Sequence, residues 1–101
     1  MIVGIEDAAF YVPNTYLSIK DFAEARNIDF LKLNKGLGLN KMALPDLNED
    51  AATMAANALV TLFKQSNIDP NEIGRVYLGT ESALDAAKPT ATYALKCLRC
   101  I

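Results

Sequence analysis

The pattern of apolar and polar residues divides the chain into short segments that resemble strands and helices in turn. Residues Val3 to Val12 are rich in apolar and aromatic side chains and run into a Pro-Asn turn pair, which predicts an opening strand. Ser18 lies three residues before Asp21, close to the spacing of a capping box. A helix with one apolar face is therefore predicted over Ile19–Arg26.

A second short helix is predicted between Asn27 and Leu39, and it leads into Lys-Gly-Leu-Gly. Gly36 and Gly38 allow backbone conformations that other residues avoid, and their spacing is typical of a plain turn. The spacing of phosphate-binding loops and of the dinucleotide fingerprint is absent. Asp29 has two interpretations, a helix N-cap residue or a polar contact at a ligand site.

The clearest element is the segment from Glu49 to about Gln65, where apolar residues recur at helical spacing. Its second apolar stripe and its many alanines predict a buried helix that a neighbouring element approaches closely. A loop is predicted before it, over Met42–Asn48. After it, Arg75–Gly79 contains a continuous apolar run, which is typical of a strand covered on both faces. This order predicts an α/β fold with a parallel strand pair and a right-handed crossover.

Glu81 directly follows the predicted strand, and ligands in open α/β sheets bind just outside the carboxyl ends of strands. A carboxylate crowded by apolar neighbours loses hydration and becomes suited to moving protons at neutral pH. The alternative is a loop glutamate that caps backbone N–H groups, and spacing alone favours neither interpretation. Asp85 and Lys88 lie three residues apart, which predicts an ion pair. Pro89 suits the first turn of a last helix that reaches about Arg99.

Composition narrows the possible functions. The chain has 101 residues, 51% of them hydrophobic and 22% charged, so it is globular in character. A net charge of −2 without a basic run gives no electrostatic footprint for nucleic acid. No apolar run is long enough to span a membrane, and no secretory leader is recognised, so a cytoplasmic protein is expected. Without histidine, the chain alone cannot build a Cys–His pair or a histidine metal site.

Cys97 and Cys100 form a Cys-x-x-Cys pair near the predicted end of the last helix. A zinc site would need two further thiolate or imidazole ligands. A redox pair profits from a helix N-terminus, whose dipole lowers the thiol pKa, whereas this pair lies at the opposite end. The pattern therefore favours neither a metal site nor a redox site.

Several motifs, taken in one register, resemble the N-terminal segment of the hydroxymethylglutaryl-CoA synthases, a family of the thiolase superfamily. These motifs are Tyr11-Val12-Pro13, Asp29 ahead of Lys-Gly-Leu-Gly, Glu49-Asp50 at the start of an alanine-rich helix, and Ile73 to Ser82 followed by Asp85 and Lys88. The most specific motif is Gly-Thr-Glu-Ser-Ala with the downstream Asp and Lys. The resemblance reaches about Thr92. It implies that residues 1–101 form the N-terminal part of a thiolase-like condensing-enzyme domain with a partial layered fold.

The resemblance also implies the chemistry of the family, which condenses acetyl-CoA with acetoacetyl-CoA in the mevalonate route. A cysteine is first acetylated, and a glutamate then takes a proton from the acetyl methyl group as general acid/base. Glu81 matches that glutamate, and Asp29 matches a position that lines the product and CoA site. No metal or redox cofactor is implied. The full-length enzyme is expected to be a homodimer.

The nucleophilic cysteine and the histidine of the family lie beyond the residues matched here. Cys97 and Cys100 come too early and in a different local sequence, so the 101-residue chain is expected to be an inactive fragment of its parent enzyme. Two alternatives stay open. A relative of ketoacyl synthase III would use cysteine, histidine and asparagine, with no glutamate at the position of Glu81. A non-catalytic small protein would instead bind a partner through exposed apolar faces.

Overall fold

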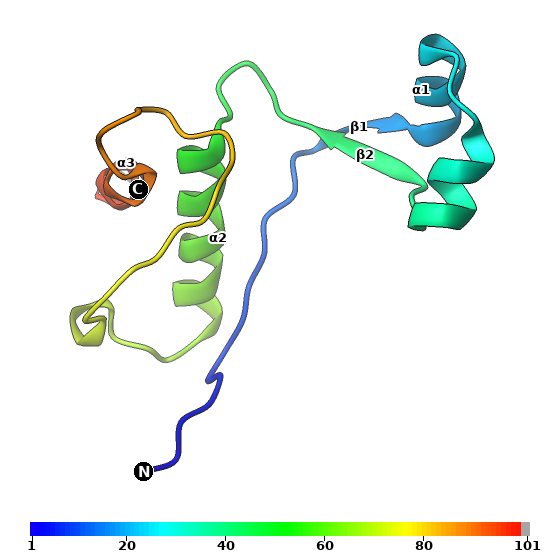
Figure 1. Cartoon of the computed structure of the whole chain (residues 1–101). Coiled ribbons are helices and arrows are strands. Elements are labelled where there is room, and N and C mark those ends of the chain that lie inside the picture. The colour runs from blue at the N-terminus through cyan, green and yellow to red at the C-terminus, as the bar shows by residue number, and fades with distance from the viewer. Residues whose placement is uncertain (100–101) are drawn as a thin grey trace. The chain divides into compact units, whose positions relative to one another are not determined.

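The computed structural model describes residues 1–99 (Figure 1). The elements, in chain order, are β1 (Thr15–Ser18), α1 (Ile19–Arg26), η1 (Lys32–Gly36), β2 (Lys41–Leu44), α2 (Ala51–Gln65), η2 (Pro70–Glu72) and α3 (Thr90–Leu98). The chain divides into two compact units. The first joins Met1–Tyr11 to the chain from Glu49 onward, and the second is Val12–Asn48.

The second unit is built on a two-stranded antiparallel ribbon. β1 pairs with β2 so that Thr15 lies opposite Leu44 and Ser18 lies opposite Lys41. The side chain of Ser18 then caps α1 by accepting a hydrogen bond from the backbone N–H of Asp21 at 3.4 Å. The helix therefore begins directly after Ser18, as the sequence predicts, whereas the strand β1 that ends at Ser18 was not predicted.

α1 has the predicted bounds, and it ends at Asn27, whose φ of 52° is left-handed. Asparagine tolerates that conformation better than most residues, which makes it a suitable helix terminator. Ile19 and Ala23, one turn apart, are the buried residues of α1, each 2% exposed. They are also the only buried residues described in the second unit, so the core of this unit is small.

The short helix predicted after Asn27 is present over residues 30–37, with the π-helical turn η1 inside it. Gly38 follows with a φ of +70°, a conformation that glycine adopts without strain. The side-chain amide of Asn34 donates to the carbonyl oxygen of Leu39 at 3.0 Å and to Oδ1 of Asn40 at 2.9 Å. These bonds hold the turn against the helix.

The predicted loop Met42–Asn48 is wrong in its first half. Met42 to Leu44 belong to β2, where exposed and half-buried residues alternate. The backbone partners for this strand come from β1, about 26 residues earlier in the chain. The alternation covers four residues only, and the following Pro45 marks a loop more strongly than so short a run marks a strand.

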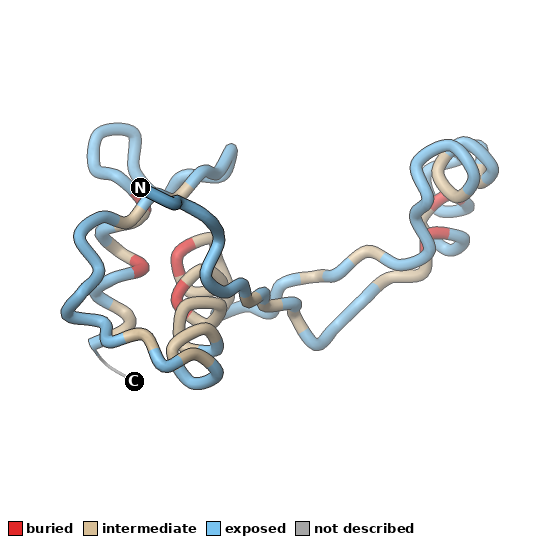
Figure 2. Tube along the Cα trace, turned by 90° about the horizontal axis from the view of Figure 1, so that it is seen from below, coloured by how far each residue is buried: buried red, intermediate tan, exposed pale blue. Residues whose placement is uncertain are grey.

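The first unit is organised around the packing of α2 against α3. Ala52 and Ala56 of α2 are each 1% exposed, and Ala94 of α3 is fully buried. Figure 2 shows the buried positions of the two helices facing each other. Alanine side chains let helix backbones approach closely, so the predicted close approach to the alanine-rich helix is confirmed. Both helices lie within two residues of their predicted bounds.

The N-terminal segment is held beside α2 by side chains from both ends of the helix (Figure 1). The hydroxyl of Tyr11 donates a hydrogen bond to the carboxylate of Glu49, just before the helix begins. At the other end, the side-chain amide of Gln65 donates to the carbonyl oxygen of Ala8 at 2.8 Å. Two motifs that carry the family resemblance, around Tyr11 and Glu49, are therefore in contact.

Two predicted strands are not formed by this chain. Val3–Val12 and Arg75–Gly79 have no strand pairing, and the described residues contain the antiparallel pair β1–β2 in place of the predicted parallel pair. A strand exists only where a second strand supplies partners for its N–H and C=O groups. Within residues 1–99, no other segment pairs with either of these two. Tyr77, in the middle of the second, is 83% exposed.

Candidate functional site

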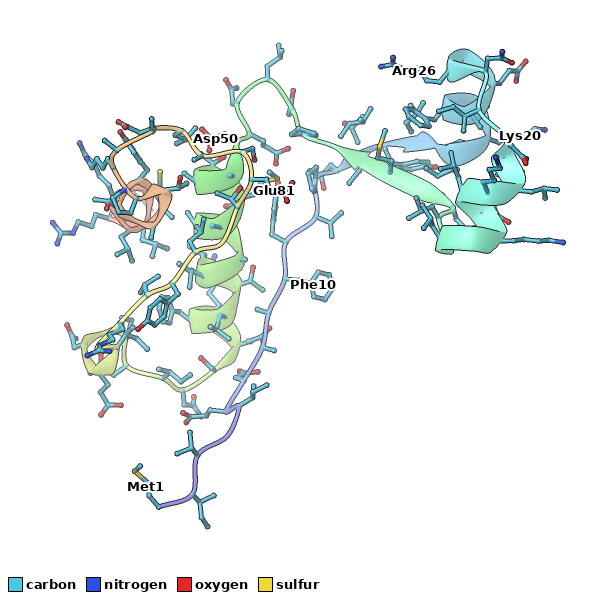
Figure 3. All side chains as sticks on the ribbon, viewed as in Figure 1. Met1, Phe10, Lys20, Arg26, Asp50 and Glu81 are labelled. Atoms are coloured by element: carbon cyan, nitrogen blue, oxygen red, sulfur yellow. The ribbon has the colours of Figure 1, made fainter. Side chains whose placement is uncertain are left out.

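Glu81 lies in the loop that joins Arg75–Gly79 to α3, and local hydrogen bonds shape the backbone on either side of it. The hydroxyl of Thr80 accepts a hydrogen bond from the backbone N–H of Ser82 at 3.1 Å. The two hydroxyl groups also lie within hydrogen-bonding distance, at 3.2 Å. This tight turn leaves the Glu81 side chain at its tip (Figure 3).

The prediction that Glu81 sits in a poorly hydrated pocket is wrong for this chain, because its side chain is exposed. Such a pocket would require cover on both faces of Arg75–Gly79. Val76 and Leu78 are only half-buried, and the residues from Gly79 to Pro89 are all exposed. The described residues therefore present the carboxylate to solvent. Glu81 keeps its position directly after the apolar run, where the sequence places it.

Asp85 organises the second half of the same loop. Its Oδ1 atom accepts hydrogen bonds from the backbone N–H groups of Ala87 at 2.8 Å and Lys88 at 3.1 Å. Its Oδ2 atom accepts a hydrogen bond from the hydroxyl of Tyr93 at 3.1 Å. One carboxylate thus closes the turn before Pro89 and ties it to α3.

Lys88 does not form the predicted side-chain ion pair with Asp85. Its ammonium group lies over the ring of Tyr93, 4.6 Å from the ring centroid, in a cation–π contact. The backbone N–H of Lys88, not its side chain, contacts the Asp85 carboxylate. A spacing of three residues brings two side chains together on a helix, whereas residues 85–88 form a non-helical turn.

The hydrogen bonds around Asp85 shift the pKa values of Asp85 and Tyr93 in opposite directions. The backbone N–H of Ala87, then that of Lys88 and then the Tyr93 hydroxyl lower the pKa of Asp85 below its ordinary value of 3.8. Each of these donors stabilises the charged carboxylate. The bond to Asp85 raises the pKa of Tyr93 above its ordinary value of 10.0, because a tyrosinate would lose that bond and face a like charge.

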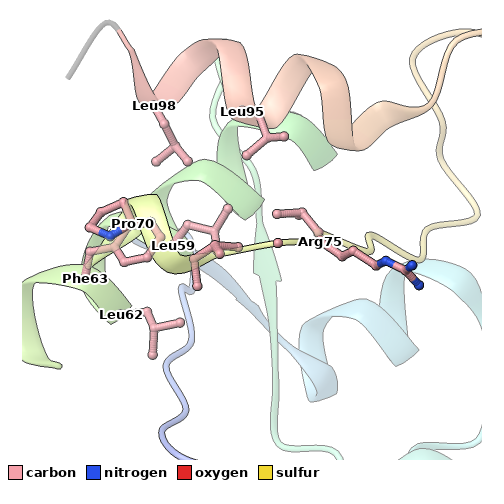
Figure 4. Close-up of a pocket in the computed structure, with 10 residues that line it drawn as sticks. Leu59, Leu62, Phe63, Pro70, Arg75, Leu95 and Leu98 are labelled. Atoms are coloured by element: carbon pink, nitrogen blue, oxygen red, sulfur yellow. The ribbon is translucent and has the colours of Figure 1, made fainter. Parts of the chain in front are cut away.

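An apolar pocket of about 460 Å³ lies elsewhere in the first unit (Figure 4). It is lined by Leu59, Leu62, Phe63, Pro70, Ile73, Gly74, Arg75, Val76, Leu95 and Leu98. Among these residues Arg75 alone is charged, and its guanidinium extends away from the leucines in Figure 4. Glu81 is not part of this lining. The pocket offers apolar contact area and no acid or base, so no chemical step is assigned to it.

Asp29 lies in the second unit, and it acts there as a helix cap. Its Oδ1 atom accepts a hydrogen bond from the backbone N–H of Leu31 at 2.9 Å, at the start of the helix over residues 30–37. Asp29 therefore has the first of its two predicted roles, that of a helix N-cap residue. A carboxylate that caps a helix through one oxygen still has a second oxygen for a ligand, so the predicted contact with substrate is compatible with the cap.

Cys97 is a half-buried free thiol near the end of α3, and Cys100 lies outside the described residues. Within residues 1–99, no three His, Cys, Asp or Glu side chains come together in a way that could hold a metal ion. None of the helices in that range is long and apolar enough to cross a membrane.

The profile of the family described as hydroxymethylglutaryl-coenzyme A synthase N terminal matches residues 1–99. The chain belongs to the hydroxymethylglutaryl-CoA synthase family. Similar relatives include the hydroxymethylglutaryl-CoA synthases of Methanocaldococcus jannaschii, at 40% identity over 91 residues, and of Archaeoglobus fulgidus, at 37% over 91 residues. Each alignment covers 90% of this chain and 26% of the relative. The chain thus spans about a quarter of the length of these curated relatives.

Solved structures of synthases have the same fold over nearly the whole chain. The structure of MvaS in complex with 3-hydroxy-3-methylglutaryl coenzyme A is 41% identical, with a TM-score of 0.83 over 95% of this chain and 23% of its own. A crystal structure of a hydroxymethylglutaryl-CoA synthase complexed with CoA gives 30% identity and a TM-score of 0.72, over 95% of this chain and 24% of its own. The predicted α/β fold of the thiolase type, present in part, is therefore confirmed.

Sequence reasoning placed Glu81, Asp85 and Lys88 on one loop but missed Tyr93. No spacing rule joins residue 85 to residue 93, since the intervening turn and the start of α3 bring them together. The available signal was indirect. An aspartate just ahead of a proline-initiated helix is a common turn former, and a tyrosine in the first turn of that helix lies within its reach.

Proposed function

We propose that this chain is the N-terminal part of an enzyme that condenses acetyl-CoA with acetoacetyl-CoA to give hydroxymethylglutaryl-CoA. The observation that carries the proposal is the family match over residues 1–99, which includes Gly79-Thr80-Glu81-Ser82 and the downstream Asp85 and Lys88. The names of the two solved relatives, with hydroxymethylglutaryl-CoA and with CoA, support thioesters of coenzyme A as substrates. The product would enter the mevalonate route.

In this proposal Glu81 is the general acid/base. It takes a proton from the methyl group of an acetyl group held on a cysteine, and the resulting enolate-like carbon attacks the ketone carbonyl of acetoacetyl-CoA. A carboxylate can perform this step only when it reaches hydrogen-bonding distance of the methyl carbon's proton. Asp29 contributes a polar contact to the CoA or product site. The cysteine and a histidine come from parts of the enzyme beyond the matched quarter.

The exposure of Glu81 in this chain has a simple explanation within the proposal. The remaining three quarters of a full-length synthase would pair with Arg75–Gly79 and cover the Glu81 loop, which lowers the local dielectric and raises the basicity of a carboxylate. We also propose a cytoplasmic homodimer for the full-length enzyme, with no metal or redox cofactor. The 101-residue chain alone is then expected to have no condensing activity.

The direct test of this function is turnover with both thioesters. With acetyl-CoA alone, the full-length protein that contains these residues should release about one CoA per active site as its cysteine is acetylated. Repeated turnover, with hydroxymethylglutaryl-CoA as the product, should require both acetyl-CoA and acetoacetyl-CoA. Residues 1–101 alone should release none. Release of CoA with acetyl-CoA and malonyl thioesters in place of acetoacetyl-CoA would point instead to a synthase of the ketoacyl type.

A second candidate function is non-catalytic binding, and the exposed apolar side chains of the first unit favour it. Ile2, Val3, Ile5 and Phe10 are each more than 80% exposed, as is Tyr77. Exposed apolar patches mark surfaces that associate with other protein. Sedimentation of the 101-residue chain over a range of concentrations tests this candidate. A monomer at every concentration would count against it.

A further inference from the structure

We propose that Tyr93 is a positioning residue for Glu81 and that it acts through Asp85, on the same loop as Glu81. The inference rests on the proposed function, because it concerns the step in which Glu81 moves a proton. Tyr93 lies in the first turn of α3, whereas Glu81 and Asp85 belong to the loop that precedes this helix. The hydrogen bond between Tyr93 and Asp85 thus ties the loop to a helix of the core.

Asp85 is suited to this task because its two carboxylate oxygens face different partners. Oδ1 accepts from the backbone N–H groups of Ala87 and Lys88, at 2.8 Å and 3.1 Å, which fixes the shape of the turn. Oδ2 accepts from the Tyr93 hydroxyl at 3.1 Å, which fixes where that turn lies on α3. Hydrogen bonds to a charged acceptor are stronger than those between neutral groups.

The anchor itself is held in place from two directions. The next residue of α3, Ala94, is fully buried against the first unit, so the backbone that carries Tyr93 is fixed. The Lys88 ammonium group lies 4.6 Å from the ring centroid of Tyr93 and restricts the orientation of the ring. The loop therefore contacts α3 through two parts of Tyr93: Asp85 bonds to its hydroxyl, and Lys88 lies over its ring.

The position of Glu81 depends on these contacts of the loop with Tyr93. The Thr80–Ser82 hydrogen bond shapes the backbone locally but joins Glu81 to nothing outside its own turn. All residues from Gly79 to Pro89 are exposed, so side-chain burial contributes little to holding the loop. Proton transfer demands close placement of the base, and a shift of about 1 Å can lower a rate by about 100-fold. Asp85 lies four residues from Glu81, near enough to pass on such a shift.

Tyr93→Phe removes the hydroxyl and keeps the ring under Lys88. In the full-length enzyme we expect the kcat of condensation to fall about tenfold, with the KM of acetoacetyl-CoA unchanged. Transfer of the acetyl group from acetyl-CoA to the enzyme cysteine, measured separately with radiolabelled acetyl-CoA, should keep its normal rate. A merely structural role would lower both steps together, through a smaller fraction of folded enzyme.

Tyr16→Phe is the matched control. Like the half-buried Tyr93, the exposed Tyr16 has a lysine over its ring, the Lys41 ammonium at 4.1 Å, but its hydroxyl has no hydrogen bond within the described part of the chain. Tyr16→Phe removes the same hydroxyl oxygen, but from a tyrosine that is not bonded to the Glu81 loop. Acetyl transfer and condensation should therefore both keep their normal rates. Asp85→Asn keeps an oxygen for the backbone N–H groups and a polar group toward Tyr93, and it should retain most of the condensation rate.

Asp85→Ala removes the hydrogen bonds at both carboxylate oxygens, to the backbone of the turn and to Tyr93, and it should cost at least as much as Tyr93→Phe. Combining Asp85→Ala with Tyr93→Phe should add no further loss, because both changes break one hydrogen bond. Normal condensation in Tyr93→Phe, or equal losses in acetyl transfer and condensation, would overturn the inference. Should Tyr93→Phe fail to fold, the comparison of Asp85→Ala with Asp85→Asn decides, and equal rates in those two would also overturn it.

Failure of this inference is distinguishable from failure of the proposed function. If Glu81→Gln abolishes condensation while Tyr93→Phe leaves it intact, Glu81 is the acid/base and Tyr93 does not position it. If Glu81→Gln condenses normally, the proposed role of Glu81 fails first.

Discussion

Asp50 and Thr53 cap the N-terminus of α2 reciprocally. The Thr53 N–H donates to Oδ1 of Asp50 at 2.8 Å, and the Asp50 N–H donates to the Thr53 hydroxyl at 2.8 Å. Two backbone donors that the helix cannot satisfy internally are thereby paired. Since α3 packs on this helix and the N-terminal segment is bonded to both of its ends, the cap stabilises the element that organises the first unit.

Asp50→Ala should lower the free energy of unfolding by about 1 kcal/mol, because it leaves a helix N–H without its acceptor. Urea denaturation followed by circular dichroism measures the change. Thr53→Ser keeps the hydroxyl that accepts from the Asp50 N–H and should lose much less. An unchanged urea midpoint in Asp50→Ala would show that the cap does not stabilise the helix.

The close packing of α2 and α3 through alanine gives a second prediction. Ala94→Leu forces three extra carbon atoms into a fully buried position and should destabilise the protein by about 1–3 kcal/mol. Ala25→Leu is the matched control, because Ala25 lies on the exposed side of α1. Equal unfolding free energies for the two variants would contradict close helix packing at Ala94.

The Asp85–Tyr93 hydrogen bond should persist over a wide range of pH, with a transition at each end. The pKa of Asp85 is depressed, so the contribution of this group to stability is present above pH 3.8 and is lost as the pH falls through its lower, folded-state pKa. The pKa of Tyr93 is raised, so the contribution of this group is present below pH 10.0 and is lost as the pH rises through its folded-state pKa.

Amide chemical shifts of Ala87 and Lys88 report this titration, because both N–H groups donate to Asp85. The acid transition should be centred below pH 3.8 and the alkaline one above pH 10.0. Tyr93→Phe should abolish the alkaline transition and keep the acid one. An acid midpoint at or above 3.8 would mean that these donors do not stabilise the carboxylate.

Asp29 allows its two roles to be separated by a single pair of variants. Asparagine caps helices about as well as aspartate, so Asp29→Asn should keep the stability of the second unit, whereas Asp29→Ala should lose about 1 kcal/mol. If Asp29 also contacts the thioester in the full-length enzyme, Asp29→Asn should raise the Kd for CoA thioesters measured by calorimetry. Unchanged affinity for CoA thioesters in Asp29→Asn would mean that Asp29 acts only as a helix cap.

The helices could be predicted from the sequence because their signals are local. Ser18 caps α1 from one residue before it, and the apolar repeat of α2 lies within a single segment. The strands could not be predicted in the same way, because a strand forms only with a partner from elsewhere in the chain. β1 depends on β2, whereas Val3–Val12 and Arg75–Gly79 have no partner strand within residues 1–99. The apolar run Arg75–Gly79 predicts a covered strand, but residues 1–99 supply neither a pairing strand nor a cover for it.

In the candidate site too, the features that depend on local sequence could be predicted, and those that depend on contacts between segments could not. The place of Glu81 after an apolar run follows from the chain order, and its proposed role rests on a motif that resembles the family's. The described residues leave its side chain exposed, because none of them covers the Glu81 loop, so the prediction of a poorly hydrated pocket was wrong here. The contact of Asp85 with Tyr93 depends on how one turn meets one helix, and the sequence indicates it only indirectly.

Glu81→Gln in the full-length enzyme tests most directly whether Glu81 moves the proton in carbon–carbon bond formation. Glutamine keeps the size of the side chain and one acceptor oxygen but cannot accept the methyl proton. Acetyl transfer from acetyl-CoA to the enzyme should continue near its normal rate, and condensation with acetoacetyl-CoA should fall by about 100-fold or more. Condensation at the wild-type rate in that variant would contradict the account.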